Sequence, residues 1–187
     1  MKTLKNRILA LAAALALSAS AAVAAPATSG GQASGYDQLA KKVRKELVTL
    51  PWYGVFDNLG YQINGSTVTL YGQVVRPTTR SDAERRVSKI AGVERVVNHI
   101  EVLPLSSFDD SIRVRTYRAL FGWNSPLFRY GRGVNPSIHI VVNGGHVTLE
   151  GVVSGEGDRR LAYLMANSVP GVFSVTNNLR AEKVRAR

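Results

Sequence analysis

Two stretches of the sequence, NGSTVTLYGQV (residues 64–74) and NGGHVTLEGVV (residues 143–153), are nearly the same and begin 79 positions apart. The same offset continues without a gap from residue 61 to residue 103. It aligns residues that shape a fold, namely Gly92 with Gly171, Val93 with Val172, and Asn98 with Asn177. Matching glycines, valines and asparagines over about forty residues indicate a duplicated folding unit. The chain is therefore predicted to contain two related domains in tandem.

Each stretch has the pattern of a β-hairpin. Asn64-Gly65 lies between two runs of alternating residues, and this dipeptide readily takes the positive φ values of a type I′ turn. With these two residues as the loop, Ile63 pairs with Ser66 and Tyr61 with Val68. Each hairpin then has one apolar face that needs a cover. The faces consist of Tyr61, Ile63, Val68 and Leu70 in the first unit, and of Ile138, Ile140, Val142, Val147 and Leu149 in the second.

One helix is predicted before the first hairpin in the sequence and another after it. Residues 36–50 have an apolar stripe at helical spacing, and Pro51 ends this helix. A second helix is predicted from Ser81, with Glu84 as its capping-box partner, to Gly92. Residues 93–102 form a third strand, reached by a crossover that should be right-handed. The predicted fold class is α+β, with two small α-β-β-α-β domains, each a three-stranded mixed sheet with two helices on one face.

The N-terminal sequence indicates export. Three basic residues precede an apolar, alanine-rich run, and Ala-Val-Ala at residues 22–24 fits a cleavage site. An uncleaved anchor is the alternative, which the short apolar run disfavours. The predicted segments are a signal peptide (1–24), a flexible leader (25–35), a first domain (36–104), a linker (105–110), a second domain (111–182) and a basic tail (183–187). The mature protein is expected in the periplasm, where it can attach to a membrane surface.

The charge of the chain favours anionic partners. Cleavage would remove three of the 24 basic residues and none of the 13 acidic ones, which leaves a net charge of +8. A basic exported protein meets anionic phospholipids, lipopolysaccharide or cell-wall polymers, so no nucleic-acid partner is expected. The chain has no cysteine, so its domains must be stabilised by packing without disulfides.

The repeated pattern resembles the BON domain, a family named for bacterial osmotic-stress and nodulation proteins. The pattern is Asn-Gly-x-x-Val-Thr-Leu-x-Gly-x-Val, then alanine on a helix, then Gly-Val-x-x-Val-x-Asn-x-Ile/Leu. It occurs at Asn64, Gly65, Val68, Thr69, Leu70, Gly72, Val74, Ala83, Gly92, Val93, Val96, Asn98 and Ile100, and again from Asn143 to Leu179. A signal peptide before two such domains is similar to the osmotically induced periplasmic members. The resemblance implies a non-enzymatic role at the cell envelope, where some members bind anionic phospholipid and others resemble chaperones or partner-binding modules.

The second unit carries about six extra residues before its first strand, within GWNSPLFRYGRGVNP (residues 122–136). Aromatic rings settle at the depth of lipid head groups and guanidinium groups bind lipid phosphates, so this segment and the helix before it suit a membrane interface. The predicted membrane-binding residues are Arg113, Arg115, Arg118, Trp123, Leu127, Phe128, Arg129 and Arg132. The alternatives are that the aromatic residues pack against the other domain, or that they stack on a polymer or protein partner.

Other residues of interest are assigned weaker or structural roles. A secondary membrane-binding candidate consists of Lys41, Lys42, Arg44, Lys45, Trp52 and Tyr53, with Phe56 nearby. The glycines interpreted as structural, at bulges, close contacts or helix ends, are Gly72, Gly92, Gly151 and Gly171. Asn98 and Asn177 are interpreted as partners of local backbone groups.

The sequence gives little support for catalysis. It has no cysteine nucleophile, and no serine lies beside an identifiable base. His139 and His146 would project from the outer face of the second hairpin near Glu150, but histidine spacing alone is weak evidence for a metal site. We therefore expect a non-catalytic envelope protein, without cofactor or metal, that associates with anionic phospholipid membranes. The alternative is a periplasmic module that binds envelope proteins or unfolded clients during envelope or osmotic stress.

Overall fold

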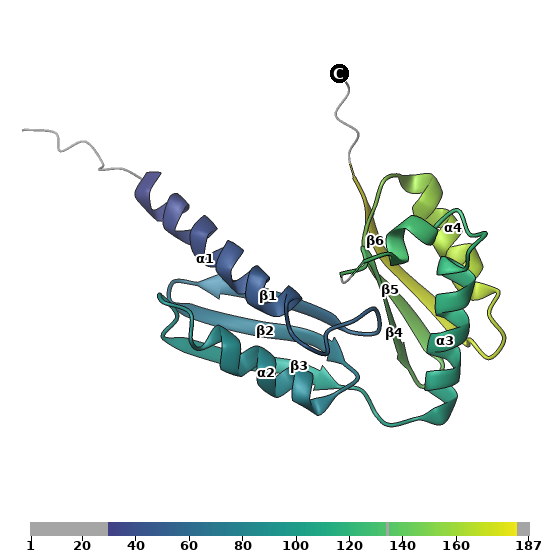
Figure 1. Ribbon diagram of the computed structural model, residues 1–187, viewed down its shortest axis with the longest axis horizontal. Helices are drawn as coiled ribbons and strands as arrows, with labels where there is room; N and C mark the ends of the chain where they lie inside the picture. Colours follow the sequence, from purple (N-terminus) through teal and green to yellow (C-terminus); the bar gives the residue numbers. More distant parts are fainter. Residues whose placement is uncertain (1–29, 134, 183–187) are drawn as a thin grey trace, which may run out of the picture.

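The structure is a computed structural model that describes residues 30–133 and 135–182 of the 187-residue chain. The predicted signal peptide, the first part of the leader and the basic tail lie outside the described residues. The first domain consists of α1 (Gly30–Val48), β1 (Asn58–Asn64), β2 (Thr67–Val74), α2 (Pro77–Val87) and β3 (Arg95–Val102). The second consists of α3 (Ser107–Phe121), the 3-10 helix η1 (Phe128–Gly131), β4 (Ile138–Asn143), β5 (His146–Val153), α4 (Glu156–Asn167) and β6 (Ser174–Ala181). Figure 1 shows the two domains side by side.

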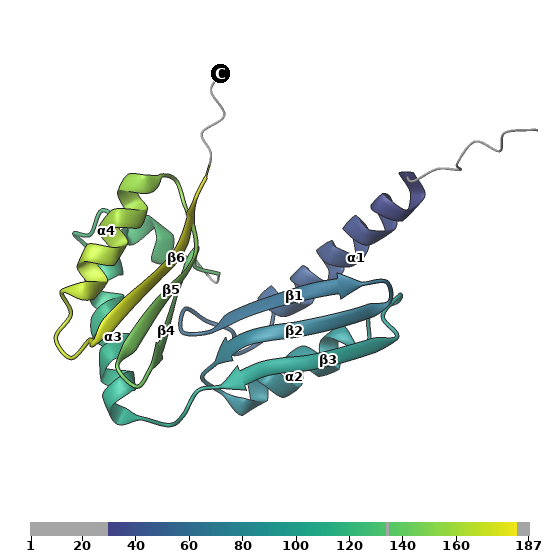
Figure 2. The ribbon, with the colours of Figure 1, turned by 180° about the vertical axis from the view of Figure 1, so that it is seen from behind.

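Both domains have the same sheet topology, with strand orders β1-β2-β3 and β4-β5-β6. The two hairpin strands are antiparallel, whereas the central and last strands are parallel and are joined through α2 or α4. In the first domain both helices cover one face of the sheet, and the view from behind shows the strands in front of them (Figure 2). The predicted α+β fold in two tandem domains is confirmed.

The first hairpin turns one residue later than predicted. Asn64 pairs with Thr67 and Ile63 with Val68, so the turn lies at residues 65–66, and the predicted pairings of Ile63 and Tyr61 are wrong. The side chains nevertheless face the predicted way, because a change of two in the pairing keeps every residue on its own side of the sheet. Ile63, Val68 and Leu70 are buried, as are all five apolar residues of the second hairpin face.

The helix α2 begins four residues earlier than predicted. It starts at Pro77 rather than Ser81, and no side chain caps it. Proline has a fixed φ suited to the first helical turn and lacks an N–H group that would need a partner there, so it can start a helix by itself. Ser81 lies inside the helix and donates its hydroxyl to the Pro77 carbonyl (3.2 Å). The predicted capping box is therefore wrong.

Two other helices begin inside segments that were predicted to be irregular. α1 starts at Gly30, so residues 30–35 of the predicted flexible leader are helical. α3 starts at Ser107, inside the predicted linker 105–110. The cause is Ser106, whose side chain accepts a hydrogen bond from the N–H group of Asp109 (3.1 Å) and so caps the helix. The irregular connection between the domains is therefore only residues 103–106.

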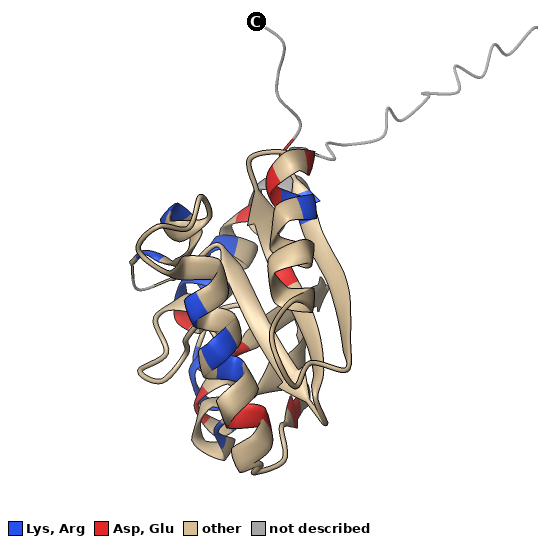
Figure 3. Ribbon diagram, turned by 90° about the vertical axis from the view of Figure 1, so that its right-hand side faces the viewer, with Lys and Arg blue, Asp and Glu red and all other residues tan. Residues whose placement is uncertain are grey.

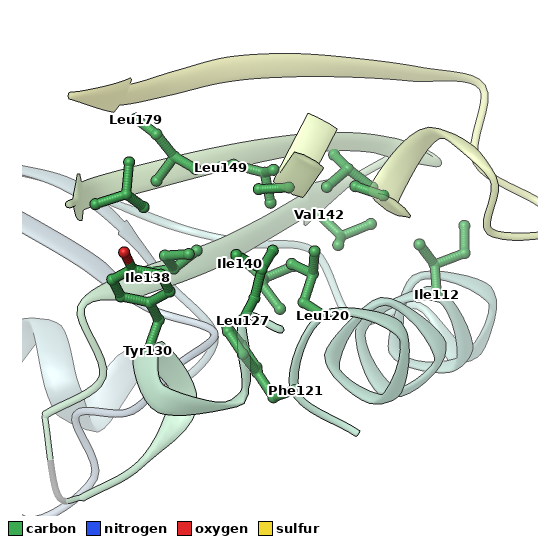
Figure 4. Packing of buried hydrophobic residues seen from close by; sticks show 14 residues of the cluster. Ile112, Leu120, Phe121, Leu127, Tyr130, Ile138, Ile140, Val142, Leu149 and Leu179 are labelled. Carbon is green, nitrogen blue, oxygen red and sulfur yellow. The ribbon is translucent and has the colours of Figure 1, made fainter. Parts of the chain in front are cut away.

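Each domain has its own apolar core between its sheet and its helices. In the first, Val43 of α1 and Val87 of α2 are fully buried against Leu70 of β2. In the second, Figure 4 shows Leu120 and Leu127 beneath Ile140 of the sheet. The core of the second domain thus extends into the inserted segment, because Leu127 belongs to it.

The repeated asparagines perform the same local task in both domains. The Asn98 amide group donates to the Arg80 carbonyl (3.3 Å), and its side-chain oxygen accepts from the N–H group of Ile100 (3.1 Å). Asn177 repeats both bonds, at 2.8 and 3.2 Å. Each asparagine therefore ties the last strand to the helix before it, in agreement with the interpretation as a partner of backbone groups.

The glycines of the pattern occupy positions with positive φ. Gly72 and Gly151 have φ angles of 118° and 127°, and a Cβ atom on either would collide with a backbone carbonyl, that of Asn58 in β1 or that of Ser137 just before β4. Gly92 and Gly171, which follow α2 and α4, have φ angles of 98° and 90°. A side chain is thus excluded at Gly72 and Gly151 by both conformation and space.

Residues 51–57, in the segment between α1 and β1 of the first domain, contact the second domain and are here called the joint loop. The carbonyl of Val55 accepts a hydrogen bond from the N–H group of Ile140 in β4 (2.8 Å). Val55 and Phe56 pack against the core of the second domain, and the Phe56 ring lies 6.2 Å from that of Tyr117 in α3. The first domain therefore contributes side chains to the packing of the second.

A partly buried polar cluster lies beside this contact, with Tyr53 and His139 half-buried and Asp57 buried. The His139 ring is 5.4 Å from the Tyr53 ring, with Nδ1 3.2 Å from the Gly54 carbonyl and Nε2 3.4 Å from the Tyr53 hydroxyl. The Asp57 carboxylate accepts the N–H groups of Gly54 (3.0 Å) and Val75 (2.8 Å). Burial lowers the pKa of His139, raises that of Asp57, and raises the pKa of Tyr53 to about 12. Burial thus favours the uncharged form of each group at this contact.

Candidate functional site

The exposed face of α3 carries the arginines that sequence analysis singled out. Phe108, Ser111, Arg115 and Arg118 recur at intervals of three or four residues, so they lie on one face of the helix. Phe108, Ser111 and Arg118 are exposed, and Arg115 is half-buried. Figure 3 shows a series of basic residues along this helix, with acidic residues near its N-terminal end. We call these four residues, with the aromatic groups at the two ends of α3 described below, the α3 surface.

Arg113 does not belong to this surface, contrary to the prediction. Its residue is 3% exposed, and its guanidinium group donates to the Val142 carbonyl of β4 (2.7 Å) and pairs with Asp110. The position lies on the core side of α3, one turn from Asp109 and from Thr116, which are also buried. The Arg113 guanidinium group is thus committed to the fold and is not available to a ligand.

The inserted segment divides into a buried part and an exposed part. Leu127 is fully buried, so its predicted contact with a membrane is excluded in this fold. Trp123 is 85% exposed and lies 5.4 Å from the Phe128 ring, and the Arg132 guanidinium group lies over Phe128 at 5.5 Å. Arg118, at the end of α3, lines the same shallow hollow as Trp123. Trp123, Phe128, Arg118 and Arg132 therefore form one aromatic and basic cluster.

Arg129 has a structural partner. Its guanidinium group donates to Asp158 (2.6 Å) and to the Tyr130 hydroxyl (3.0 Å), and the hydrogen bond to Tyr130 raises the pKa of Arg129 further above its usual value. The Tyr130 hydroxyl also accepts the N–H group of Ser154 (2.8 Å), which fixes η1 to the end of β5. The exposed Arg129 side chain is therefore partly neutralised by Asp158, unlike its neighbour Arg132.

A second aromatic cluster lies at the other end of α3 and was missed by sequence analysis. Leu105 is 97%, Phe173 68% and Phe108 45% exposed, and the rings of Phe108 and Phe173 are 5.7 Å apart. Gly145 permits this contact, because a Cβ atom there would meet both rings.

The repeat held a signal for this second cluster. In the first domain, Ser66 donates to Glu94 (2.7 Å) at the tip of the hairpin. At the offset of 79, Gly145 and Phe173 replace this polar pair with an apolar one. The replacement of a charge by an exposed phenylalanine at an otherwise repeated position was visible in the sequence.

The α3 surface is mainly basic, and its exposed carboxylate, Asp110, lines the same hollow as Arg115 and Arg118 but pairs with Arg113. Within the described part of the chain, Arg115, Arg118 and Arg132 form no ion pair, whereas Arg113 and Arg129 do. The Asp109 carboxylate at the start of α3 is buried and accepts the N–H groups of Gly144 and Gly145 (2.9 and 2.8 Å). The exposed face thus presents guanidinium groups between two aromatic ends.

The secondary candidate in the first domain is only partly brought together. Lys41, Lys42, Arg44 and Lys45 are exposed on α1. Trp52 is 55% exposed, with the Arg76 guanidinium group 4.6 Å above its ring. Tyr53 faces the second domain instead, and Phe56 packs into it. Packing against the other domain, the alternative expectation for the insert, is thus seen for Tyr53 and Phe56 of the joint loop and not for Trp123.

The two histidines lie in different surroundings. His139 contacts the joint loop, whereas His146 is exposed and bonded to Ser174 (2.7 Å). Among the described residues, no group of three or more His, Cys, Asp or Glu side chains is arranged to hold a metal ion. None of the described helices has both the length and the apolar character needed to span a bilayer.

The fold and the repeat define a class of protein built from two α-β-β-α-β modules. The model of the BON domain matches residues 37–104 and 121–183, so the chain belongs to the BON domain family and contains the domain twice. The second match begins at the last residue of α3, so the residues on the exposed face of this helix lie outside the match, whereas Trp123, Phe128, Arg132 and Phe173 lie within it.

No curated protein sequence matches the chain. Two solved structures of CdsD, a structural protein of the type III secretion system of Chlamydia trachomatis, are similar with 11% identity and a TM-score of 0.28. The first, of the C-terminal domain, covers 78% of this chain and 98% of its own, and the second covers 80% and 99%. Such a TM-score supports no inference about function.

Proposed function

We propose that this BON protein is a non-catalytic component of the cell envelope that associates with anionic phospholipid surfaces through the α3 surface. The observation that carries the proposal is the 85% exposure of Trp123 beside Arg118 and Arg132, which lack acidic partners among the described residues. A large exposed aromatic residue next to unbalanced guanidinium groups has the chemistry of a membrane interface.

The arrangement suits a helix that lies along the membrane. Phe108 and Phe173 at one end of α3 and Trp123 at the other can enter the head-group layer, while Arg115 and Arg118 between them bind phosphates. Each basic residue near an anionic surface contributes about 1 kcal/mol, and this contribution falls as salt screens the charge. The aromatic contribution depends on buried apolar area and is less sensitive to salt.

The envelope location and the absence of catalysis are parts of the proposal. Both are supported by membership of the BON family, and the location also by the predicted signal peptide.

The test is co-sedimentation of residues 25–187 with liposomes. Vesicles of phosphatidylglycerol and phosphatidylcholine should bind the protein, and vesicles of phosphatidylcholine alone should bind it much less. The double variant Arg115→Glu/Arg118→Glu should weaken binding at low salt by more than about thirtyfold, because at least about 2 kcal/mol is lost. The variant Trp123→Ala/Phe173→Ala should remove the binding that persists at high salt.

A matched control distinguishes an effect of net charge from an effect of where the charge lies. Arg95→Glu/Arg160→Glu makes the same change in net charge at two exposed residues outside the α3 surface, and it should retain most of the binding. Equal losses in both charge-reversed variants would reduce the effect to net charge and refute a specific surface. If the parent protein ignored anionic vesicles but bound unfolded polypeptide at high salt, the protein-binding alternative would replace the lipid proposal.

A further inference from the structure

The joint loop fixes the position of the first domain against the second. It thereby also fixes the two sides of a groove, one side from each domain. The hydrogen bond from Ile140 to Val55 and the packing of Phe56 fix the first domain against the second. Between them lies a groove of about 550 Å³, lined on one side by α1 and β1 and on the other by the ends of β4, β5 and β6. Its volume falls within the range of about 300–1,000 Å³ that is typical of ligand sites.

The groove is basic. Arg44 of α1 and Arg180 of β6 line it from opposite domains, and both are exposed. None of the described residues that line it is acidic. Two guanidinium groups without a carboxylate in the lining favour an anionic ligand, and a guanidinium group binds carboxylate or phosphate through two parallel hydrogen bonds.

The groove also contains a flat aromatic surface. Tyr71 pairs across the strands with Gly60, and a Cβ atom at Gly60 would collide with the Tyr71 ring. The ring therefore lies directly against the backbone of β1, and its hydroxyl reaches the Tyr61 carbonyl (3.4 Å). Tyr71 remains 48% exposed. One face of the ring is thus held by the strand, and the rest is open to a ligand.

This geometry disfavours a peptide strand as the ligand. An extended peptide would need the unpaired backbone groups at the edge of β1. The Tyr71 hydroxyl already bonds to one of these, the Tyr61 carbonyl. A ring-shaped ligand can instead lie flat on Tyr71 while its acidic group reaches an arginine.

We propose that this groove between the domains is a binding site for an anionic saccharide, with a sugar ring on Tyr71 and a carboxylate or phosphate on Arg44 and Arg180. None of its lining residues belongs to the α3 surface, so this site is independent of the proposed lipid association. The tyrosine presents an apolar face to the C–H groups of a sugar and a hydroxyl to its polar edge.

The experiment is an NMR titration of ¹⁵N-labelled residues 25–187 with a galacturonic acid trisaccharide. Neutral maltotriose and inorganic phosphate are titrated in parallel. The amide signals of Gly60, Tyr71 and Arg180 should shift with the acidic trisaccharide, weakly with phosphate, and not with maltotriose. The variants Arg44→Gln/Arg180→Gln and Tyr71→Ala should each bind the acidic trisaccharide at least about tenfold more weakly than the parent. Arg95→Gln/Arg160→Gln should bind like the parent.

Three results would overturn the proposal. One is the absence of shifts at millimolar acidic trisaccharide. Another is unchanged affinity in Arg44→Gln/Arg180→Gln when its amide spectrum shows the parent fold. The third is phosphate binding as tight as that of the trisaccharide with no effect of Tyr71→Ala, because the groove would then recognise an anion without a sugar ring.

Discussion

Replacing Arg113 by alanine should destabilise the second domain, although the residue is one of several arginines in the same helix. The Arg113 side chain is 4% exposed, and it donates to the Val142 carbonyl at 2.7 Å. Loss of a hydrogen bond from a charged donor to a buried carbonyl costs about 1.5–3 kcal/mol. Two buried methylene groups, Cγ and Cδ, add about 1.6 kcal/mol, and about 2 kcal/mol of side-chain entropy is regained. The expected net loss is about 2 kcal/mol.

Native-state hydrogen exchange measures this loss separately in the two domains. The slowest amides of β5 report the opening of the second domain, and those of β2 report the opening of the first. In Arg113→Ala the free energy of opening should fall at β5 by about 2 kcal/mol. In the control Arg118→Ala, an exposed position on the same helix, it should change by less than about 0.5 kcal/mol.

The same measurement can refute the reasoning. An opening free energy at β5 that stays within about 0.5 kcal/mol of the parent in Arg113→Ala would mean that the bond to Val142 does not stabilise the domain. The result also bears on lipid binding, because a charge reversal that includes Arg113 would unfold the surface under test. Variants for liposome binding must therefore leave this arginine in place.

Two further predictions concern backbone space and pH. Gly151→Ala should destabilise the second domain by about 2–4 kcal/mol in urea unfolding, since the added Cβ meets the Ser137 carbonyl at a positive φ. Gly157→Ala, in open space within α4, should not destabilise, and equal effects of the two would contradict this account. Burial lowers the pKa of His139 below its usual 6.5. The stabilisation that depends on a neutral His139 ring is therefore complete above pH 6.5 and is lost as the pH falls through the lowered pKa. His139→Gln should therefore flatten the decline of the thermal midpoint toward pH 5 seen by circular dichroism, and parallel declines would show that His139 is not its source.

The elements of the fold were predictable because alternation and repetition are local signals. The buried faces of both hairpins followed from the period of two, but that period cannot distinguish two pairings that differ by two residues. This is why the residues facing the core were right while the partners of Ile63 were wrong. Sequence analysis predicted the start of α2 from the capping box at Ser81 and missed Pro77, at which the helix begins.

The candidate site was harder to predict because burial decides which arginines are available. Residue type does not distinguish Arg113 from Arg115 and Arg118. Only Arg113 follows Asp109 by four residues and precedes Thr116 by three, which places it on the buried side of α3. Helical spacing could have shown this. That Val142 would supply a carbonyl to its guanidinium group could not be read from the sequence, because the partner lies 29 residues away on β4.

A comparison of equivalent positions in the two repeats explains why the two domains have different surfaces. The N–H group of Val75, at the end of the first hairpin, is bound by Asp57 (2.8 Å). The equivalent N–H group of Ser154 is bound by Tyr130 of the insert (2.8 Å), since proline replaces the aspartate at the corresponding position 136. The insert thus supplies, with Tyr130 and Leu127, the anchoring that the first domain obtains from one carboxylate.

This substitution gives the insert both a structural and a surface part. Because Tyr130 and Leu127 fix η1 against the sheet, the neighbouring Trp123, Phe128 and Arg132 are held outside it rather than buried. In the first domain the corresponding segment, the joint loop, is shorter. Phe56, one of its aromatic residues, packs against the core of the second domain. One repeat therefore uses the segment after its first helix to fix the partner domain, and the other uses it to expose an aromatic and basic surface.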